Sequence, residues 1–122
     1  MPTRISQAEL DVMEIVWARA PIAATDVAQA LATEKDWNIR TVKTLLARLV
    51  EKEALSTEKD GRRFLYRPLI DRKAYVGGAA TRLVDRLFGG RAAPLVAQLA
   101  ESKTLSADDV AELEAIIQAL KS

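Results

Sequence analysis

The sequence predicts a mainly α-helical protein with a single β-hairpin, ordered as three helices, the hairpin and three further helices. Two observations support this fold class. Apolar residues recur at helical spacing over most of the chain, and the period changes to an alternation only in residues 54–69. A length of 122 residues fits one domain, or one small domain with an appendage.

A capping box predicts the start of the first helix. Ser6 is followed three residues later by Glu9, so each side chain can bond the free backbone N–H of the other residue. Pro21 ends this helix and prevents an early restart. Residues 22–32 then predict a second, short helix, although its start lacks a strong cap. The apolar face of the first helix consists of Leu10, Met13, Val16 and Trp17.

The third helix follows a polar connector. Asn38 is a good N-cap, and we expect the helix to run from about Ile39 to about Glu53. One side of it is apolar and carries Val42, Leu45, Leu46, Leu49 and Val50. The opposite side is basic and hydroxylic, with Arg40, Thr41, Lys43, Thr44 and Arg48.

The hairpin is predicted from the stretch "ALSTEKDGRRFLYRPL". Asp60-Gly61 between two strand-like runs is a strong hairpin signal, because both residues tolerate positive φ. Phe64 and Tyr66 alternate with Leu65, so we expect one or both faces of the second strand to pack on the domain.

Three helices are predicted in the last part of the chain. Asp71 caps the first of them, and Gly89-Gly90 ends it. Inside this helix, Gly77-Gly78 cost about 1 kcal/mol per glycine relative to alanine, so the helix either bends there or packs closely against something. The predicted helices occupy about residues 72–88, 92–102 and 106–120.

The first four elements predict a winged helix-turn-helix in residues 1–70, in which the third helix is the recognition helix and residues 56–67 form the wing. Residues 71–122 are too few for a core of their own, because single cores are marginal at about 50 residues. Their apolar stripes need a partner, and a second copy of the chain is the simplest one. We therefore expect a C-terminal helical dimerisation domain. Four residues fit either the protomer core or the dimer seam: Tyr75, Leu83, Leu87 and Phe88.

The composition disfavours an enzyme. The chain has no Cys and no His, which removes disulfides, thiolate metal sites and imidazole bases together. It also lacks a paired carboxylate signature and a Gly-rich phosphate loop, so we expect no cofactor and no metal. No apolar stretch approaches the roughly 20 residues that span a bilayer, and "MPTRISQAEL" has no apolar signal region. We expect a cytoplasmic protein without membrane insertion.

Positive charge is concentrated in one segment of a chain whose net charge is only +1. Residues 40–67 hold eight Lys and Arg against four Asp and Glu. Cations there can neutralise phosphates, and the first turns of a helix can place side chains against base edges in the major groove. We expect double-stranded DNA as the partner, contacted by Arg40, Thr41, Lys43, Thr44 and Arg48 of the helix and by Lys59, Arg62 and Arg63 around the hairpin turn.

Other interpretations compete with this hypothesis. A helix with three cations and two threonines on one side is commonly just solvated, and cations near a hairpin turn usually are as well. A winged helix can also be a protein-interaction module whose basic face meets an acidic protein, with no sequence-specific DNA binding. Trp17 and Trp37 are expected to pack in the core or at helix junctions rather than stack on bases.

The sequence resembles the penicillinase-repressor (BlaI/MecI/CopY) family of small winged-helix dimers. The first three matching stretches form an ordered signature, and the weaker similarity extends over nearly the whole chain. These stretches are "ISQAELDVMEIVW" at 5–17, "TVKTLLARLVEKEAL" at 41–55, "GRRFLYRPLID" at 61–71 and "LSADDVAELEAII" at 105–117.

The resemblance implies a homodimeric transcriptional repressor of β-lactamase or related resistance and stress genes, bound to a dyad-symmetric operator. The recognition role then falls on Arg40, Thr41, Lys43, Thr44 and Arg48, and the wing contacts on Arg62 and Arg63. Dimerisation falls on the stripes of the last three helices, including Leu83, Leu87, Leu95, Leu99, Leu113 and Ile117.

Three departures from the family matter. The copper-responsive members carry a C-terminal cysteine cluster that this chain lacks, which disfavours copper release through thiolates. The antibiotic-responsive members are cut at an Asn-Phe bond by a protease under the control of a membrane sensor. The matching position is Gln98-Leu99, so the region is kept but the scissile pair is not. Glu53 replaces the glycine that usually follows the recognition helix, which changes the helix end.

Overall fold

The computed structural model describes residues 4–122, and the first three residues of the predicted N-terminal domain lie outside the described residues. The chain separates into two compact units, Met1–Tyr75 and Val76–Ser122. The division falls inside helix α4 (Arg72–Phe88), a little more than one helical turn beyond the boundary predicted after residue 70.

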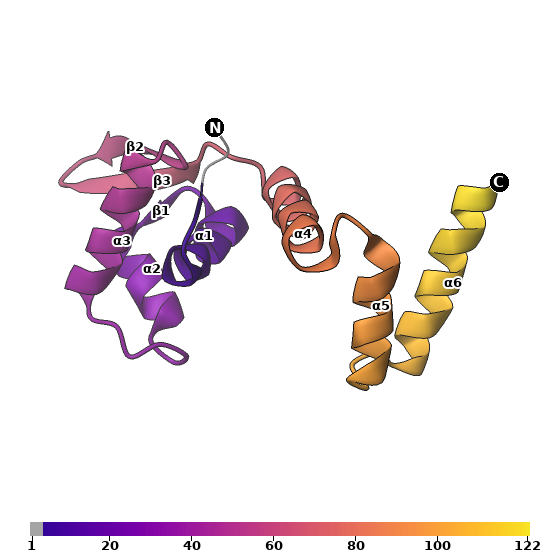
Figure 1. The fold of residues 1–122 in the computed structure, drawn as a ribbon. Helices are drawn as coiled ribbons and strands as arrows, with labels where there is room; N and C mark the ends of the chain where they lie inside the picture. Colours follow the sequence, from indigo (N-terminus) through magenta and orange to yellow (C-terminus); the bar gives the residue numbers. More distant parts are fainter. Residues whose placement is uncertain (1–3) are drawn as a thin grey trace. The chain divides into compact units, whose positions relative to one another are not determined.

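The first unit contains three helices and a small sheet (Figure 1). The three strands form an antiparallel sheet in the order β1-β3-β2, so the hairpin β2–β3 is extended by one short strand from the first half of the unit. The predicted three helices and hairpin are all present. Their bounds are α1 (Gln7–Arg19), β1 (Ile22–Ala23), α2 (Ala24–Leu31), α3 (Ile39–Glu51), β2 (Leu55–Asp60) and β3 (Arg63–Pro68).

Strand β1 differs from the prediction, which placed its two residues at the start of the second helix. Ile22 pairs with Tyr66 and Ala23 pairs with Leu65, both antiparallel. Helix α2 begins only at Ala24, and no side chain caps it. A two-residue strand that pairs with residues more than 40 positions away has no local sequence signal, so periodicity could not reveal it.

The buried carboxylate of Glu9 joins the beginning of α1 to the end of α3. The predicted capping box is formed: the Ser6 N–H donates to Glu9 Oε1 at 2.8 Å, and the Glu9 N–H donates to Ser6 Oγ at 3.1 Å. Lys52, the C-cap residue of α3, donates from Nζ to the same Oε1 at 2.6 Å and to the Arg4 carbonyl oxygen at 2.9 Å. Glu9 is only 1% exposed, so this ion pair is shielded on the carboxylate side.

Opposing effects act on the pKa of Glu9. Burial raises the pKa, whereas the hydrogen bond from Lys52, the two hydrogen bonds with Ser6 and the charge of Lys52 lower it. The balance leaves the pKa below its ordinary value, so Glu9 is ionised in the folded protein at neutral pH. Its second oxygen, Oε2, is buried without a hydrogen-bond partner among residues 4–122.

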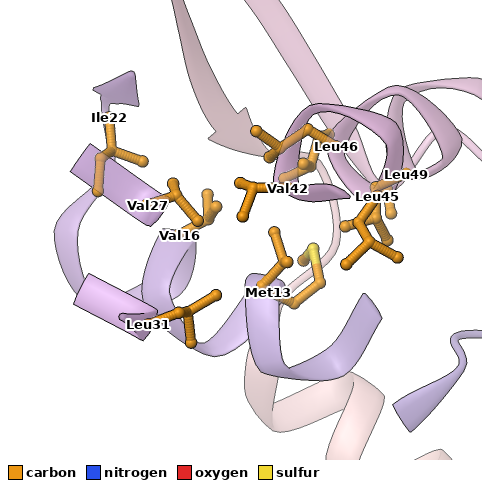
Figure 2. Packing of buried hydrophobic residues seen from close by; sticks show 12 residues of the cluster. Met13, Val16, Ile22, Val27, Leu31, Val42, Leu45, Leu46 and Leu49 are labelled. Atoms are coloured by element: carbon orange, nitrogen blue, oxygen red, sulfur yellow. The ribbon is translucent and has the colours of Figure 1, made fainter. Parts of the chain in front are cut away.

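One hydrophobic core holds the first unit together, and Figure 2 shows its side chains converging from α1, α2 and α3. Trp17 and Trp37 pack at its margin, which confirms the prediction that they are packing residues. The core consists of Val12, Met13, Val16, Ile22, Val27, Leu31, Val42, Leu45, Leu46, Leu49, Ala54 and Leu55.

Helix α3 ends two residues earlier than predicted, because Glu53 adopts the left-handed conformation with φ of 63°. The N–H of Glu53 bonds to the Val50 carbonyl at 3.0 Å, and the N–H of Ala54 bonds to the Leu49 carbonyl at 2.9 Å. These two bonds form a Schellman motif, in which glycine is favoured at the left-handed residue. Glutamate at this position is strained because its Cβ crowds the following carbonyl.

The hairpin turn lies one residue later than the Asp-Gly signal suggests. Asp60 is the last residue of β2 and pairs with Arg63, so the two-residue loop is Gly61-Arg62. Gly61 has φ of 64° and occupies the first central position, where a type II′ turn requires glycine.

Side chains of α1 hold the first turn of α4. The indole N–H of Trp17 donates to the Ile70 carbonyl at 2.9 Å, and its ring lies 6.0 Å from that of Tyr75. Arg72 makes a bidentate ion pair with Glu14 at 2.7 and 3.1 Å. Tyr75, which the sequence left open between core and seam, therefore packs within the first unit.

In the second unit, all of which the structure describes, helices form but none of their residues is buried. The unit comprises most of α4, then α5 (Ala92–Glu101) and α6 (Ala107–Lys121), and Ser106 and Asp109 form a capping box at the start of α6. A Cβ added at Gly77 would meet nothing within 4 Å, so no close approach within the described chain requires that glycine. The large exposed apolar residues of this unit are Val76, Leu83, Leu87, Val110, Ile116, Ile117 and Leu120.

Replacing Glu9→Gln should lower the unfolding free energy at pH 7 by about 1–3 kcal/mol, because a charge-assisted hydrogen bond inside the protein is lost. The folded-state pKa of Glu9 lies below its ordinary value of 4.5, which we take for the unfolded chain. The ionised carboxylate therefore stabilises the fold fully above that pH, and this contribution disappears as the pH falls through the folded-state pKa. Urea unfolding at a series of pH values should show the two proteins converging in acid, and a constant difference would contradict this account.

Replacing Glu53→Gly should raise the unfolding free energy by about 1 kcal/mol, because glycine removes the left-handed strain at the end of α3. Glu53→Ala is the matched control, since it removes the same charge but keeps a Cβ. Equilibrium urea unfolding should rank the glycine variant above the other two proteins. Equal stability of the glycine and alanine variants would show that the strain is absent.

Candidate nucleic-acid interface

Helix α3 presents two chemically different sides. Val42, Leu46 and Leu49 are fully buried, and Leu45 nearly so, which fixes the rotation of the helix about its axis. Its first turn is held by Asn38, whose Oδ1 accepts from the Thr41 N–H at 2.9 Å, as predicted. The opposite side is consequently turned to solvent.

We call the exposed residues of that side the recognition face: Arg40, Lys43, Thr44, Ala47 and Arg48. From Arg40 to Arg48 it extends about 12 Å along the helix. Thr41 is half-buried and lies at the edge of the face. Less of its side chain is therefore accessible to a partner than the sequence prediction implies. Thr44 donates its hydroxyl hydrogen to the Arg40 carbonyl at 3.0 Å, which leaves its lone pairs and methyl group outward.

The cations of the recognition face are free to bind anions. Within residues 4–122, no carboxylate forms an ion pair with Arg40, Lys43 or Arg48. The small side chain of Ala47 lies between them and permits a close approach of the backbone to a partner. Guanidinium and ammonium groups on the N-terminal turns of an exposed helix can bond guanine O6 and N7 or backbone phosphates.

The hairpin β2–β3, which we call the wing, carries two neighbouring arginines in different environments, although the sequence predicted the same role for both. Arg62 lies in the turn, is exposed, and has no carboxylate partner among the described residues. Arg63 donates from Nε to Asp60 at 3.3 Å, an exposed ion pair across the turn. Arg62 is therefore the more available cation for DNA.

Phe64 is the clearest surface feature that sequence reasoning missed. Tyr66 packs against the core as expected, but Phe64, on the same strand and the same face, is 53% exposed. The alternation of the strand predicted that the two rings would share a face, yet it could not show where along that face the core ends.

The six residues predicted to dimerise do not behave alike. Leu83, Leu87 and Ile117 are exposed, and Leu87 is 62% exposed. Leu95, Leu99 and Leu113 are half-buried. All six lie in the second unit. Because none of them is buried, each keeps some exposed surface that a partner could cover.

The predicted cleavage position, Gln98-Leu99, lies in the last turns of α5. Gln98 is exposed, and its carbonyl accepts from the Ser102 hydroxyl at 2.9 Å. The Leu99 carbonyl accepts from the N–H of Thr104 at 3.0 Å. This bond closes the C-terminal end of α5, where Lys103 adopts the left-handed conformation. The bond is therefore held in helical structure on both sides.

Two other kinds of site are absent from the described part of the chain. Residues 4–122 contain no group of three or more acidic side chains placed to hold a metal ion. In the same residues, every helix is too short or too polar to cross a membrane.

Comparison with known proteins identifies relatives over nearly the whole chain. The family model described as penicillinase repressor matches residues 5–119. The penicillinase repressor of Bacillus licheniformis is 33% identical over 119 residues, which cover 98% of this chain and 93% of the relative.

Two solved structures resemble the first unit. One is the solution structure of the DNA-binding domain of the repressor BlaI, with a TM-score of 0.55 and 40% identity over 60% of this chain and 89% of that chain. The other is monomeric BlaI of Bacillus licheniformis in complex with the blaP half-operator, with a TM-score of 0.52 and 40% identity over 59% of this chain and 88% of that chain. The first unit therefore has the winged helix-turn-helix fold that the sequence predicts, and this fold is that of a DNA-binding domain.

Proposed function

This chain belongs to the penicillinase repressor family, and from that premise we propose that it acts as a homodimer that places one α3 helix in each half of a dyad-symmetric operator. Family membership makes it a DNA-binding transcriptional repressor and not an enzyme. The dimer, the symmetric operator and the residues that read it are our proposals.

The observation that most strongly supports the proposal is the recognition face of α3. Arg40, Lys43 and Arg48 are exposed without ion-pair partners in residues 4–122, on a helix whose other side is locked into the core. BlaI, which is 40% identical over this unit, has been solved with a half-operator bound. If α3 lies in the major groove, as the second helix of a helix-turn-helix does, its first turns lie at base edges and Arg48 lies near a phosphate.

The wing supplies the second contact. Arg62 at the turn extends toward the DNA that flanks the major-groove site, where it neutralises phosphate without reading sequence. The solved BlaI complex with operator DNA also favours this function over the alternative of a protein-interaction module that does not bind DNA.

Dimerisation through the second unit is supported by its surface. Helices α4, α5 and α6 bury no residue within one chain, although they carry large apolar side chains at helical spacing. An apolar surface of this kind marks an interface, and two-fold association of identical chains generates the symmetry of a dyad operator. We assign the seam to Leu83, Leu87, Leu95, Leu99, Leu113 and Ile117.

Our proposals for the regulated genes and the inducing signal rest on family membership alone. We propose control of a β-lactamase or of related resistance and stress genes, in the cytoplasm, where bacterial DNA is bound. A membrane sensor with a protease is the proposed partner for release, acting near Gln98-Leu99. We do not propose release from DNA by copper binding to thiolates, because the chain contains no cysteine to bind the copper.

Replacing Lys43→Ala should weaken operator binding by about 1–3 kcal/mol, because a side chain at a base edge is lost. If Lys43 instead binds only phosphate, the loss should be equal for all sequences, and the log–log salt slope should fall by about 0.9 per protomer. Fluorescence anisotropy on operator and scrambled duplexes over a salt series separates the two. Arg67→Ala is the control, since Arg67 lies in the wing but is paired with Glu58 at 3.0 Å. Absence of duplex binding by the unmodified protein at low salt would overturn the proposal.

Replacing both Leu87→Glu and Ile117→Glu should convert the dimer to a monomer, because charges would be buried in the seam. Light scattering at micromolar concentration should show half the mass of the unmodified protein, and affinity for the full operator should fall more than affinity for a half-site. Leu69→Glu is a matched control, since Leu69 is 58% exposed but lies in the first unit. A monomeric mass for the unmodified protein would exclude the homodimer.

A further inference from the structure

The two faces of the wing differ in chemistry. Directly opposed residues of an antiparallel pair point to the same side of the sheet, and the side alternates along each strand. The pairs Leu55–Pro68, Thr57–Tyr66 and Lys59–Phe64 therefore share one face, and Leu55 and Tyr66 show that this face packs on the helical core. The remaining pairs, Ser56–Arg67, Glu58–Leu65 and Asp60–Arg63, occupy the outer face.

The outer face is electrostatically neutralised. Asp60 pairs with Arg63 at 3.3 Å, and Glu58 pairs with Arg67 at 3.0 Å. Its two cations are thus matched by two carboxylates. This face therefore offers the phosphates of DNA no net electrostatic attraction.

The core-side face carries no carboxylate at any of its register positions in β2 and β3. Near its base this face is covered by the core. Toward the turn it continues past the core, where Lys59 and Phe64 are exposed and lie directly opposite each other on the two strands. Arg62 lies immediately beyond them in the turn. Lys59, Arg62 and Phe64 are all exposed, so the two cations and the ring are accessible together.

We infer that Phe64 is a DNA-contacting residue, whose ring packs against the apolar faces of deoxyribose at the edge of the minor groove while Lys59 and Arg62 bind the adjoining phosphates. This inference rests on the proposed DNA binding and adds a residue and a face to it. An aromatic ring with two neighbouring cations matches the repeating sugar and phosphate of a duplex backbone, and Phe is among the apolar residues that proteins place in the minor groove. Arg63, which the sequence predicted to contact DNA, lies on the opposite face and is paired with Asp60, so we assign it no contact in this arrangement.

The inference is tested by measuring the DNA affinity and the salt dependence of Phe64 and Lys59 variants of the intact dimer, on operator and scrambled duplexes. Phe64→Ala should weaken binding about tenfold, equally for operator and scrambled duplexes, because the contact is apolar and reads no base. It should leave the log–log salt slope unchanged, whereas Lys59→Ala should reduce the slope by about 0.9 per protomer. Phe64→Leu should recover most of the affinity, since it restores apolar contact area.

Two controls separate this role from a structural one. Asp60→Asn combined with Arg63→Gln removes the ion pair beside Phe64 on the outer face without changing net charge, and affinity should stay within about twofold of the unmodified protein. Thermal unfolding of free Phe64→Ala should occur within about two degrees of the unmodified protein, because the ring is more than half exposed. Shortening the duplex to the base pairs under α3 should abolish the difference in affinity between the unmodified protein and the Phe64→Ala variant.

The outcomes are distinguishable. If the unmodified protein binds no duplex, the proposed function fails. If it binds and Phe64→Ala binds equally well on the long duplex, the function stands and the inference is overturned. A large drop in thermal stability with affinity lost in proportion to unfolding would also overturn it, by showing that Phe64 supports the fold rather than the complex.

Discussion

The rotation of α3 about its own axis is the constraint on which the interface depends. Leu46 and Leu49 are fully buried, and each contributes about 1.5–3 kcal/mol relative to exposure. A turn of the helix by one residue position would bring such side chains to the surface and polar ones into the core. The recognition face is therefore outward because the apolar side must stay in the core. The ion pair between Glu9 and Lys52 also fastens the C-terminal end of α3 to α1, just before the chain enters the wing.

The two units obtain their structure from different sources. In the first, a shared core stabilises helices of 8 to 13 residues, a length at which an isolated helix is at best marginal in water. In the second, local signals define the helices, among them the capping box at Ser106 and the left-handed ends at Gly89 and Lys103. Local signals determine where a helix begins and ends, but not what covers its apolar side. We propose that a second copy of the chain covers it.

The parts of the molecule that are encoded locally could be predicted from the sequence. The helix caps at Ser6 and Asn38, the order of the elements and the basic side of α3 all depend on residues a few positions apart, and the structure confirms them. Strand β1 and the Glu9–Lys52 pair were missed, because these join residues more than 40 positions apart. Arg62 and Arg63 were predicted to be equivalent, since only the register of the wing shows that Asp60 neutralises one of them. The count of charges along a segment does not predict which of them remain free.

The strained end of α3 has a consequence for the lifetime of the protein in a cell. An energetic cost of about 1 kcal/mol at Glu53 raises the unfolded population about fivefold relative to a glycine at that position. The Lys103 backbone, with φ of 58°, adds a second position of the same kind. Proteases act on the unfolded population, so such costs shorten the time that each molecule survives. The concentration of a repressor follows a change in its synthesis only as fast as old molecules are removed, and a less stable helix end makes that adjustment faster.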